Sequence, residues 1–198
     1  MKDLGDIATF TGGRSYRSRD LHNSDTALVT LKSFRRGGGY RYDGLKPYIG
    51  RFRDEQVIEP GDVVLACTDV TQAAEVIGKP AIVQPSPHYT KLVASLDAMI
   101  MRPSSGRVNR EFLYLLCSTE RFADYTYAHT SGTTVLHLSK KAIPSFRAVV
   151  PSHDVMAVFD KVSIPVFAKM QTISREQDAL AGLRDALLPG LVSGVVVV

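Results

Sequence analysis

Few side chains in this 198-residue sequence have the types and spacing that catalysis requires. None of the five histidines stands in an HExxH or HxE pattern, which would place metal ligands or a base together; they are His22, His88, His129, His137 and His153. Ser131-Gly132 lacks the flanking glycines of a GxSxG nucleophile elbow. We interpret Asp62 as a turn residue and Asp69 as a polar loop residue. The motifs therefore give little support to an enzyme acting alone.

The glycine run in RRGGGYRY (residues 35–42) is the other candidate for chemistry. It lacks both the GxGxxG register of a dinucleotide-binding turn and the Lys-Ser/Thr of a P-loop. Glycines beside arginines are typical of a hairpin tip. Neither a glycine-rich methyltransferase loop nor a proline-aromatic catalytic tetrapeptide occurs in the sequence. Cys67 and Cys117 have no metal-ligand spacing, so we expect free, buried thiols in a reducing cytoplasm. We predict no catalytic residue, no metal site and no cofactor on this chain.

Positive charge is concentrated in one fifth of the chain. Residues 14–53 contain ten Lys or Arg and three Asp or Glu, a net charge of +7; the whole chain carries +4, so the rest carries −3. Such asymmetry favours a polyanionic partner, of which nucleic acid is the first candidate. The alternative is a basic surface that is merely solvated.

Polar and aromatic residues in the predicted loops could contact nucleic acid. Arginine reads guanine bidentately, Asn or Gln reads adenine, and lysine suits phosphates. Gln72 is the best candidate for reading adenine. Each residue alone could be an ordinary exposed side chain, but the cluster is more persuasive. The predicted DNA contacts are Arg14, Tyr16, Arg17, Arg19, Lys32, Arg35, Arg36, Tyr40, Arg41, Tyr42, Thr68, Gln72, Lys91, Thr133, Thr134 and Lys140.

The elements that must position these residues suggest an α+β domain over residues 1–150. β-branched runs predict strands, turn signals such as RRGGGYRYDG, EPGD and IGKP separate them, and Pro103 ends the last run; the predicted strands are TALVTLKSF, DVVLACTDV, AIVQP and SLDAMIMRP. One helix is predicted over residues 109–127, with Asn109 as N-cap. Its expected apolar face consists of Phe112, Leu115, Leu116 and Phe122. TSGTTVLHLSKKAI then predicts a loop, a short strand and a turn.

Residues 151–190 predict a long helix with a heptad-like apolar seam. Pro165 predicts a kink or two helical pieces, and Pro189-Gly190 should end the helix. Residues 166–188 alone would span about 35 Å at 1.5 Å per residue. The helix either packs on its own domain or pairs with another chain. Residues 191–198 form a Val-rich tail, interpreted as an added strand or a non-native end. The predicted dimerisation residues are Phe159, Val162, Val166, Met170, Ile173, Gln177, Leu180 and Leu187.

Four segments in this order resemble the specificity subunits of type I restriction-modification systems: LGDIATFTGGR, EPGDVVLACTDVTQAAEVIGKPAIV, TSGTTVLHLSKKAI and LRDALLPGLVSG. The resemblance implies a twisted, mainly antiparallel sheet domain with packed helices, which recognises one half of a split double-stranded DNA sequence. It further implies a coiled-coil-like helix that spaces two such domains. S-adenosylmethionine, ATP and Mg²⁺ are expected only on the modification and restriction subunits.

The family pattern has two recognition domains and two spacer helices, whereas this sequence contains one of each. The sequence is therefore either a fragment or a natural half-subunit. For a half-subunit, we hypothesise that a second copy supplies the missing half through residues 154–188, so that the target is an inverted repeat with half-sites about one helical turn apart. Gln177 and Arg184 would then help to fix the register of the pair.

Three other readings stay open. The chain could serve another methyltransferase or bind another nucleic acid such as RNA; it could hold an unusual hydrolase or transferase site around His129–His137; or it could be a dimerisation module with a solvated basic segment. No apolar run reaches the roughly 18 residues needed to span a membrane, and the first residues do not read as a signal peptide. We expect a cytoplasmic protein without a membrane partner.

Overall fold

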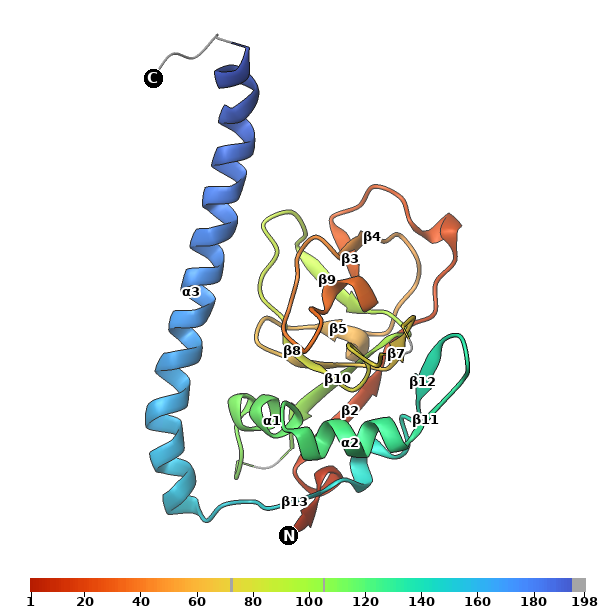
Figure 1. Cartoon of the computed structure of the whole chain (residues 1–198), viewed down its shortest axis with the longest axis vertical. Helices are drawn as coiled ribbons and strands as arrows, with labels where there is room; N and C mark the ends of the chain where they lie inside the picture. The colour runs from red at the N-terminus through yellow and green to blue at the C-terminus, as the bar shows by residue number, and fades with distance from the viewer. Residues whose placement is uncertain (72, 105, 194–198) are drawn as a thin grey trace. The chain divides into compact units, whose positions relative to one another are not determined.

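The computed structural model describes residues 1–71, 73–104 and 106–193, and the chain divides into two compact units, Met1–Met156 and Ala157–Val198 (Figure 1). The first unit is built from short strands, two α-helices and single turns of 3-10 helix. Its strands are β1 (Lys2–Asp3), β2 (Ala8–Gly12), β3 (Thr26–Val29), β4 (Lys46–Pro47), β5 (Val57–Ile58), β6 (Val63–Ala66), β7 (Thr68–Asp69), β8 (Pro80–Ile82), β9 (Lys91–Ala94), β10 (Ala98–Pro103), β11 (Thr130–Ser131), β12 (Leu136–Leu138) and β13 (Arg147–Ala148). Its helices are α1 (Arg110–Cys117), α2 (Glu120–Ala128), η1 (Leu4–Asp6), η2 (Ser18–Asp20), η3 (Leu31–Ser33), η4 (Asp54–Gln56) and η5 (Ile143–Ser145). Helix α3 (His153–Val192) follows.

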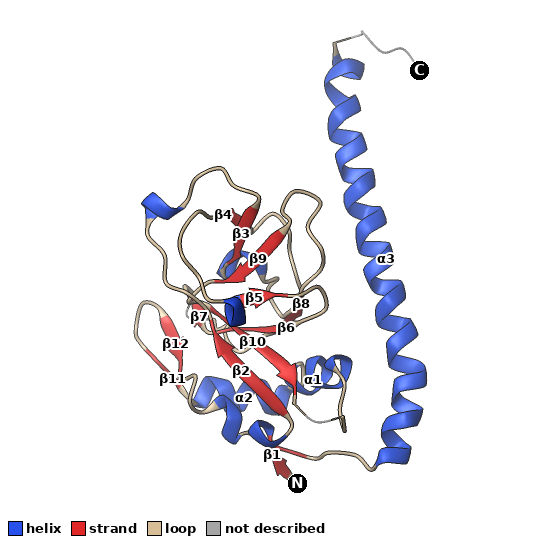
Figure 2. Cartoon of the chain, turned by 180° about the vertical axis from the view of Figure 1, so that it is seen from behind, coloured by secondary structure: helices blue, strands red, loops and turns tan. Residues whose placement is uncertain are grey.

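Two four-stranded sheets organise the first unit (Figure 2). One has the order β2–β10–β6–β8 and is antiparallel throughout. The other has the order β4–β3–β9–β5, in which β3 and β9 run parallel and the other pairs are antiparallel. Smaller antiparallel sheets join β11, β12 and β7, and β1 with β13. The predicted α+β fold with a mainly antiparallel sheet is confirmed.

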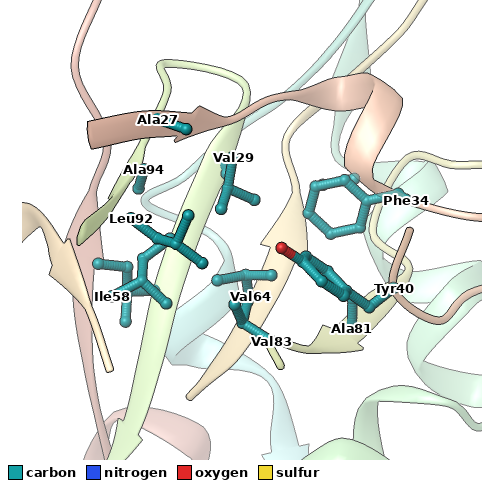
Figure 3. Packing of buried hydrophobic residues seen from close by; sticks show 13 residues of the cluster. Ala27, Val29, Phe34, Tyr40, Ile58, Val64, Ala81, Val83, Leu92 and Ala94 are labelled. Carbon is teal, nitrogen blue, oxygen red and sulfur yellow. The ribbon is translucent and has the colours of Figure 1, made fainter. Parts of the chain in front are cut away.

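The main hydrophobic core lies between the two four-stranded sheets (Figure 3). Val29 and Leu92 reach it from β3 and β9, and Val64 and Ala81 reach it from β6 and β8. Because side chains alternate along a strand, Val63 and Leu65 point to the opposite face of the first sheet, where α1 contacts β6, β8 and β10. Strand β6 is therefore buried on both faces, which explains its unbroken apolar sequence.

The single helix predicted over residues 109–127 is in fact two helices. The Ser118 and Thr119 hydroxyls donate to the carbonyls of Tyr114 and Leu116, and Thr119 Oγ1 accepts a hydrogen bond from Phe122 N, capping α2. Serine and threonine favour such local bonds over continuing a helix. The predicted apolar face is also partly wrong, since Leu115 is exposed. The buried residues of the two helices are Leu113, Cys117, Phe122 and Thr126. The predicted N-cap is confirmed, because Asn109 Oδ1 accepts from Phe112 N at 2.8 Å.

Helix α3 is one continuous helix of 40 residues, about 60 Å long at 1.5 Å per residue. The predicted end at Pro189-Gly190 is wrong, and so is a division into two helical pieces at Pro165. The alternative, a kink at Pro165, stays a prediction. A proline removes only one backbone donor from the helix ladder, and a long helix retains its remaining hydrogen bonds. At the end, Ser193 N donates to Pro189 O at 3.0 Å, so the last turn continues past the proline. Leu191 and Val192 are thus helical, and residues 194–198 lie outside the described residues.

The two cysteines are free and buried, as predicted. Burial raises the pKa of the Cys67 thiol to about 12 and raises the pKa of the Cys117 thiol further. Both therefore behave as small apolar core residues.

Candidate nucleic-acid interface

A pocket of about 530 Å³ brings together two segments that the sequence analysis singled out. One wall is the segment from η3 to Gly44, with the cationic side chains of Lys32, Arg36 and Arg41. The other wall consists of Asp69, Val70, Thr71, Glu75 and Val76, which follow β7. We use the name β7 loop for the described residues that follow β7, which are 70–71 and 73–77; four of them line this wall. Basic side chains thus stand opposite a loop of mixed polarity.

Glycines bind the two walls to each other. Gly37, Gly38 and Gly39 all have positive φ angles, between 79° and 111°, which favour glycine. Gly37 N donates to Glu75 O, and Gly39 N donates to Pro80 O, each at 2.9 Å. The glycine run therefore forms the predicted turn, but this turn is hydrogen-bonded to Glu75 in the β7 loop and to Pro80 in β8, so it is not a free tip.

Asp69 holds the β7 loop at both ends. Its Oδ1 accepts hydrogen bonds from Thr71 N and Thr71 Oγ1, both at 2.8 Å. Its Oδ2 accepts from Val76 N at 2.7 Å and Ile77 N at 3.1 Å. Burial alone would raise the pKa of this carboxyl, but these four hydrogen bonds together hold the pKa below its usual range. The interpretation of Asp69 as a simple polar loop residue is wrong, since its side chain is buried and organises the loop.

Ion pairs engage part of the basic segment. Arg36 pairs with Glu75 at 3.2 Å, Arg41 pairs with Asp43, and Arg53 pairs with Glu55 at 3.0 Å. Hydrogen bonding to Arg41 lowers the pKa of the Asp43 carboxyl. Six other exposed cations of the segment form no ion pair with a described carboxylate: Arg14, Arg17, Arg19, Lys32, Arg35 and Arg51. Exposed cations of this kind are available to an external anion.

A second group of predicted residues surrounds β9 and the start of β10. Arg14 N donates to Ala94 O at 2.8 Å. Lys140 Nζ donates to Leu96 O at 2.7 Å. Lys91 Nζ lies 5.5 Å from the centre of the Phe52 ring. The ammonium groups of Lys140 and Lys91 thus contact a backbone carbonyl and an aromatic ring, whereas Arg14 is held here through its backbone.

Tyr16 meets a cation that the sequence analysis did not single out. Lys46 Nζ donates to Tyr16 Oη at 3.2 Å and lies 5.3 Å from the ring centre. Lys46 and Glu75 were both missed because their relevance depends on contacts between segments distant in sequence. Asp69 gave a weak signal, because an Asp two residues before a Thr is typical of a local side-chain turn.

Three predicted residues are placed less favourably for contact with nucleic acid. Tyr40 is 8% exposed and belongs to the main core, where burial raises the pKa of its hydroxyl (Figure 3). Thr68 is also 8% exposed and donates its hydroxyl to Asp97 Oδ1 at 3.0 Å. Tyr42 is partly buried and donates to Gln84 Oε1 at 2.7 Å. We therefore remove Tyr40 and Thr68 from the candidate surface, because strand pairing and core packing occupy them.

Two predicted residues in the connection between β11 and β12 do not line the pocket. Thr133 and Thr134 are exposed in the connection between β11 and β12. Gln72, the predicted adenine reader, lies outside the described residues.

Most of the predicted dimerisation residues are exposed along α3. Val162 is 63% exposed, Met170 54% and Leu180 64%, and Val166, Ile173, Gln177 and Leu187 are also exposed. Phe159 is only partly exposed. Burying an apolar side chain is worth roughly 1.5–3 kcal/mol, so a row of exposed ones marks a surface suited to a partner.

The histidine region shows packing contacts. His129 Nδ1 lies 2.8 Å from Tyr125 O, and the two rings are 4.3 Å apart. Within residues 1–71, 73–104 and 106–193, no group of three or more His, Cys, Asp or Glu is arranged to hold a metal ion. No helix in the described part of the chain has the length and hydrophobicity to cross a membrane.

Comparison with known proteins shows what this chain is similar to. No protein-family model matches the chain. The Type I restriction enzyme HindI specificity subunit of Haemophilus influenzae is 31% identical over 199 residues, which is 98% of this chain and 41% of the relative. The chain thus spans about two fifths of the length of this curated relative.

Solved structures show the same fold. The type I restriction-modification S subunit from M. genitalium superposes with a TM-score of 0.62 at 9% identity, over 97% of this chain and 45% of that one. The HsdS subunit from Thermoanaerobacter tengcongensis superposes with a TM-score of 0.52 at 15% identity, over 96% and 43% of the two chains. In sequence this chain is similar to the HindI specificity subunit, and its fold is similar to that of solved S subunits of type I restriction-modification systems.

Proposed function

We propose that this chain is a sequence-specific recognition subunit for double-stranded DNA in a type I restriction-modification complex, and that it reads one half-site. The observation that carries the proposal is the 31% identity to the HindI specificity subunit over 98% of the chain. The pocket between the η3–Gly44 segment and the β7 loop supports it, because both walls present polar side chains and one wall is basic. Exposed arginines suit phosphates and base edges alike.

We further propose that α3 joins two copies of the chain. The predicted seam is apolar and exposed in the single chain, and a two-fold pair would bury it in an isologous interface. Two recognition units related in this way would read an inverted repeat with a spacer. Modification and restriction subunits would bind this pair and would bring S-adenosylmethionine, ATP and Mg²⁺. In this scheme the present chain recognises the DNA sequence, and its partner subunits carry out the catalysis.

Methylation mapping tests the proposal directly. Genomic DNA from cells with and without the chain is sequenced for modified adenines. We expect a bipartite motif with inverted-repeat symmetry that is methylated only when the chain is present. An unchanged methylation pattern in cells that make the modification subunit would refute the recognition role. A motif with only one specified half would refute the paired arrangement while supporting recognition.

A further inference from the structure

The anchoring of the β7 loop by one carboxylate has a consequence for specificity. Asp69 Oδ1 binds the start of the loop at Thr71, and Oδ2 binds its end at Val76 and Ile77. The four donors use both oxygens of the side chain. Asp69 itself is 1% exposed, so it cannot contact a ligand. It acts only on the shape of the loop beside it.

The loop that Asp69 shapes carries two residues suited to base edges. Val70 is 67% exposed although it is apolar and directly follows the buried Asp69. Thr71 lines the pocket together with Lys32 and Arg36. In the major groove an apolar group meets the thymine methyl, and Thr can accept or donate a hydrogen bond. The loop therefore presents one apolar and one polar contact side by side.

The hydrogen bond from Thr71 to Asp69 restricts what Thr71 can recognise. A hydroxyl has one hydrogen and two lone pairs. The hydrogen is directed to Asp69 Oδ1 at 2.8 Å, which is a charge-assisted bond and therefore stronger than a neutral one. Toward an external group, Thr71 Oγ1 can then only accept. The base atoms that donate in the major groove are adenine N6 and cytosine N4, so guanine and thymine offer this atom no partner.

We propose that Asp69 is a positioning residue for sequence recognition, which fixes the β7 loop and commits Thr71 to accept a hydrogen bond from an adenine or cytosine amino group. This inference rests on the proposed function, because it needs the pocket to face DNA. Neither Val70 nor Thr71 is among the DNA contacts predicted from the sequence. Val70 would contribute an apolar contact at an adjacent base pair.

The variant Asp69→Asn removes the hydrogen-bonded anchor at one end of the β7 loop and keeps the other. An amide keeps one accepting oxygen but turns an NH₂ toward donors at the other end, so one anchor is lost. The variant chain, assembled with its modification subunits, is incubated with random duplex DNA, and the bound fraction is sequenced. We expect it to keep its salt-dependent affinity for DNA and to lose about ten-fold in preference at one or two adjacent positions of the wild-type motif.

A matched control is Asp62→Asn. Asp62 also accepts a backbone hydrogen bond, from Glu59 N at 2.8 Å, and it pairs with Arg102 at another turn of the same domain. The control should lower stability without changing the motif. If Asp69→Asn keeps the full wild-type motif, or weakens every position equally as a destabilised domain would, the proposal is overturned.

Thr71→Val provides a second variant that keeps the volume of the side chain and both anchors at the end of the loop. We expect it to reduce the preference for adenine or cytosine at one position by about three- to ten-fold, and we expect Thr71→Ser to restore it. A motif unchanged by Thr71→Val would overturn the contact. If the wild-type complex itself selects no sequence, it is the proposed function that fails, and the two failures are thus distinguished.

Discussion

Removing three exposed arginines should change the salt dependence of DNA binding in a predictable way. Nine of the predicted contact residues are Lys or Arg, and two of these, Arg36 and Arg41, pair with carboxylates. If the other seven meet phosphates, log K falls with log salt with a slope of about −6. The triple variant Arg17→Ala, Arg19→Ala, Arg35→Ala retains four, so its slope should be about −4.

The two slopes are far apart in a simple titration. Between 50 and 200 mM salt the wild-type affinity should fall by about four orders of magnitude, and that of the variant by about two. Fluorescence anisotropy with a labelled duplex, read across this range for the assembled complex, measures both. The sequence preference should survive, because phosphate contacts carry no sequence information.

The matched control removes three arginines of the same segment that already have carboxylate partners: Arg36→Ala, Arg41→Ala, Arg53→Ala. Its formal charge change is identical, but we expect its slope to move by less than about one. Equal changes in the two triple variants would mean that only the net charge of the domain matters. An unchanged slope in the first variant would refute the assignment of Arg17, Arg19 and Arg35 to phosphates.

Three further predictions concern α3, the thiols and the β7 loop. The double variant Met170→Glu, Ile173→Glu should weaken self-association at least about 100-fold, because burying unpaired charges in the interface costs several kcal/mol. Light scattering measures the self-association. The prediction is contradicted if two glutamates placed on the exposed opposite face of α3 weaken it equally. Cys67 and Cys117 should resist a thiol reagent at pH 8 until denaturant is added, since burial keeps both protonated. The pKa of Asp69 is lowered in the folded state, so the contribution of this carboxylate to the free energy of unfolding is present above pH 4 and lost below it. The difference in unfolding free energy between the wild type and Asp69→Asn, about 1–3 kcal/mol at pH 7, should therefore narrow in urea titrations at lower pH. A difference that stays constant with pH contradicts this.

The fold was predictable where local chemistry dominates. The sequence predicts both the strand β6, from its apolar run, and the glycine turn at 37–39, because β-branched runs and clustered glycines adopt few alternative structures. Strand β2, with the sequence ATFTG, was missed because its polar threonines mask the pattern, and its pairing with β10 depends on residues about 90 positions away. The break between α1 and α2 was missed because hydroxyl bonds in a Ser-Thr pair outweigh the apolar periodicity around them.

The candidate site was predictable in composition but not in arrangement. Positive charge in residues 14–53 and the polar content of the loops are linear properties, and they pointed to the right segments for a pocket. The burial of a side chain, by contrast, depends on contacts between segments distant in sequence and cannot be read from the sequence alone. Tyr40 looks like its neighbour Tyr42 in sequence, yet one ring packs in the core while the hydroxyl of the other reaches Gln84. Likewise, only the fold shows that Glu75 meets Arg36.

The exposed arginines and the β7 loop suit two kinds of proposed contact with DNA. Arg17, Arg19 and Arg35 are exposed and form no ion pair with a carboxylate of the described chain, and a long flexible arginine can follow a phosphate wherever the backbone places it. Base reading needs the opposite property, since a displacement of about 1 Å removes a hydrogen bond. The described ends of the β7 loop are held in place, because Asp69 accepts hydrogen bonds from Thr71 and Val76 and the glycine turn donates to Glu75 O. If the proposed function holds, we expect affinity and specificity to vary independently: changes in the arginines should alter how tightly the chain binds DNA, and changes in the β7 loop should alter which sequence it prefers.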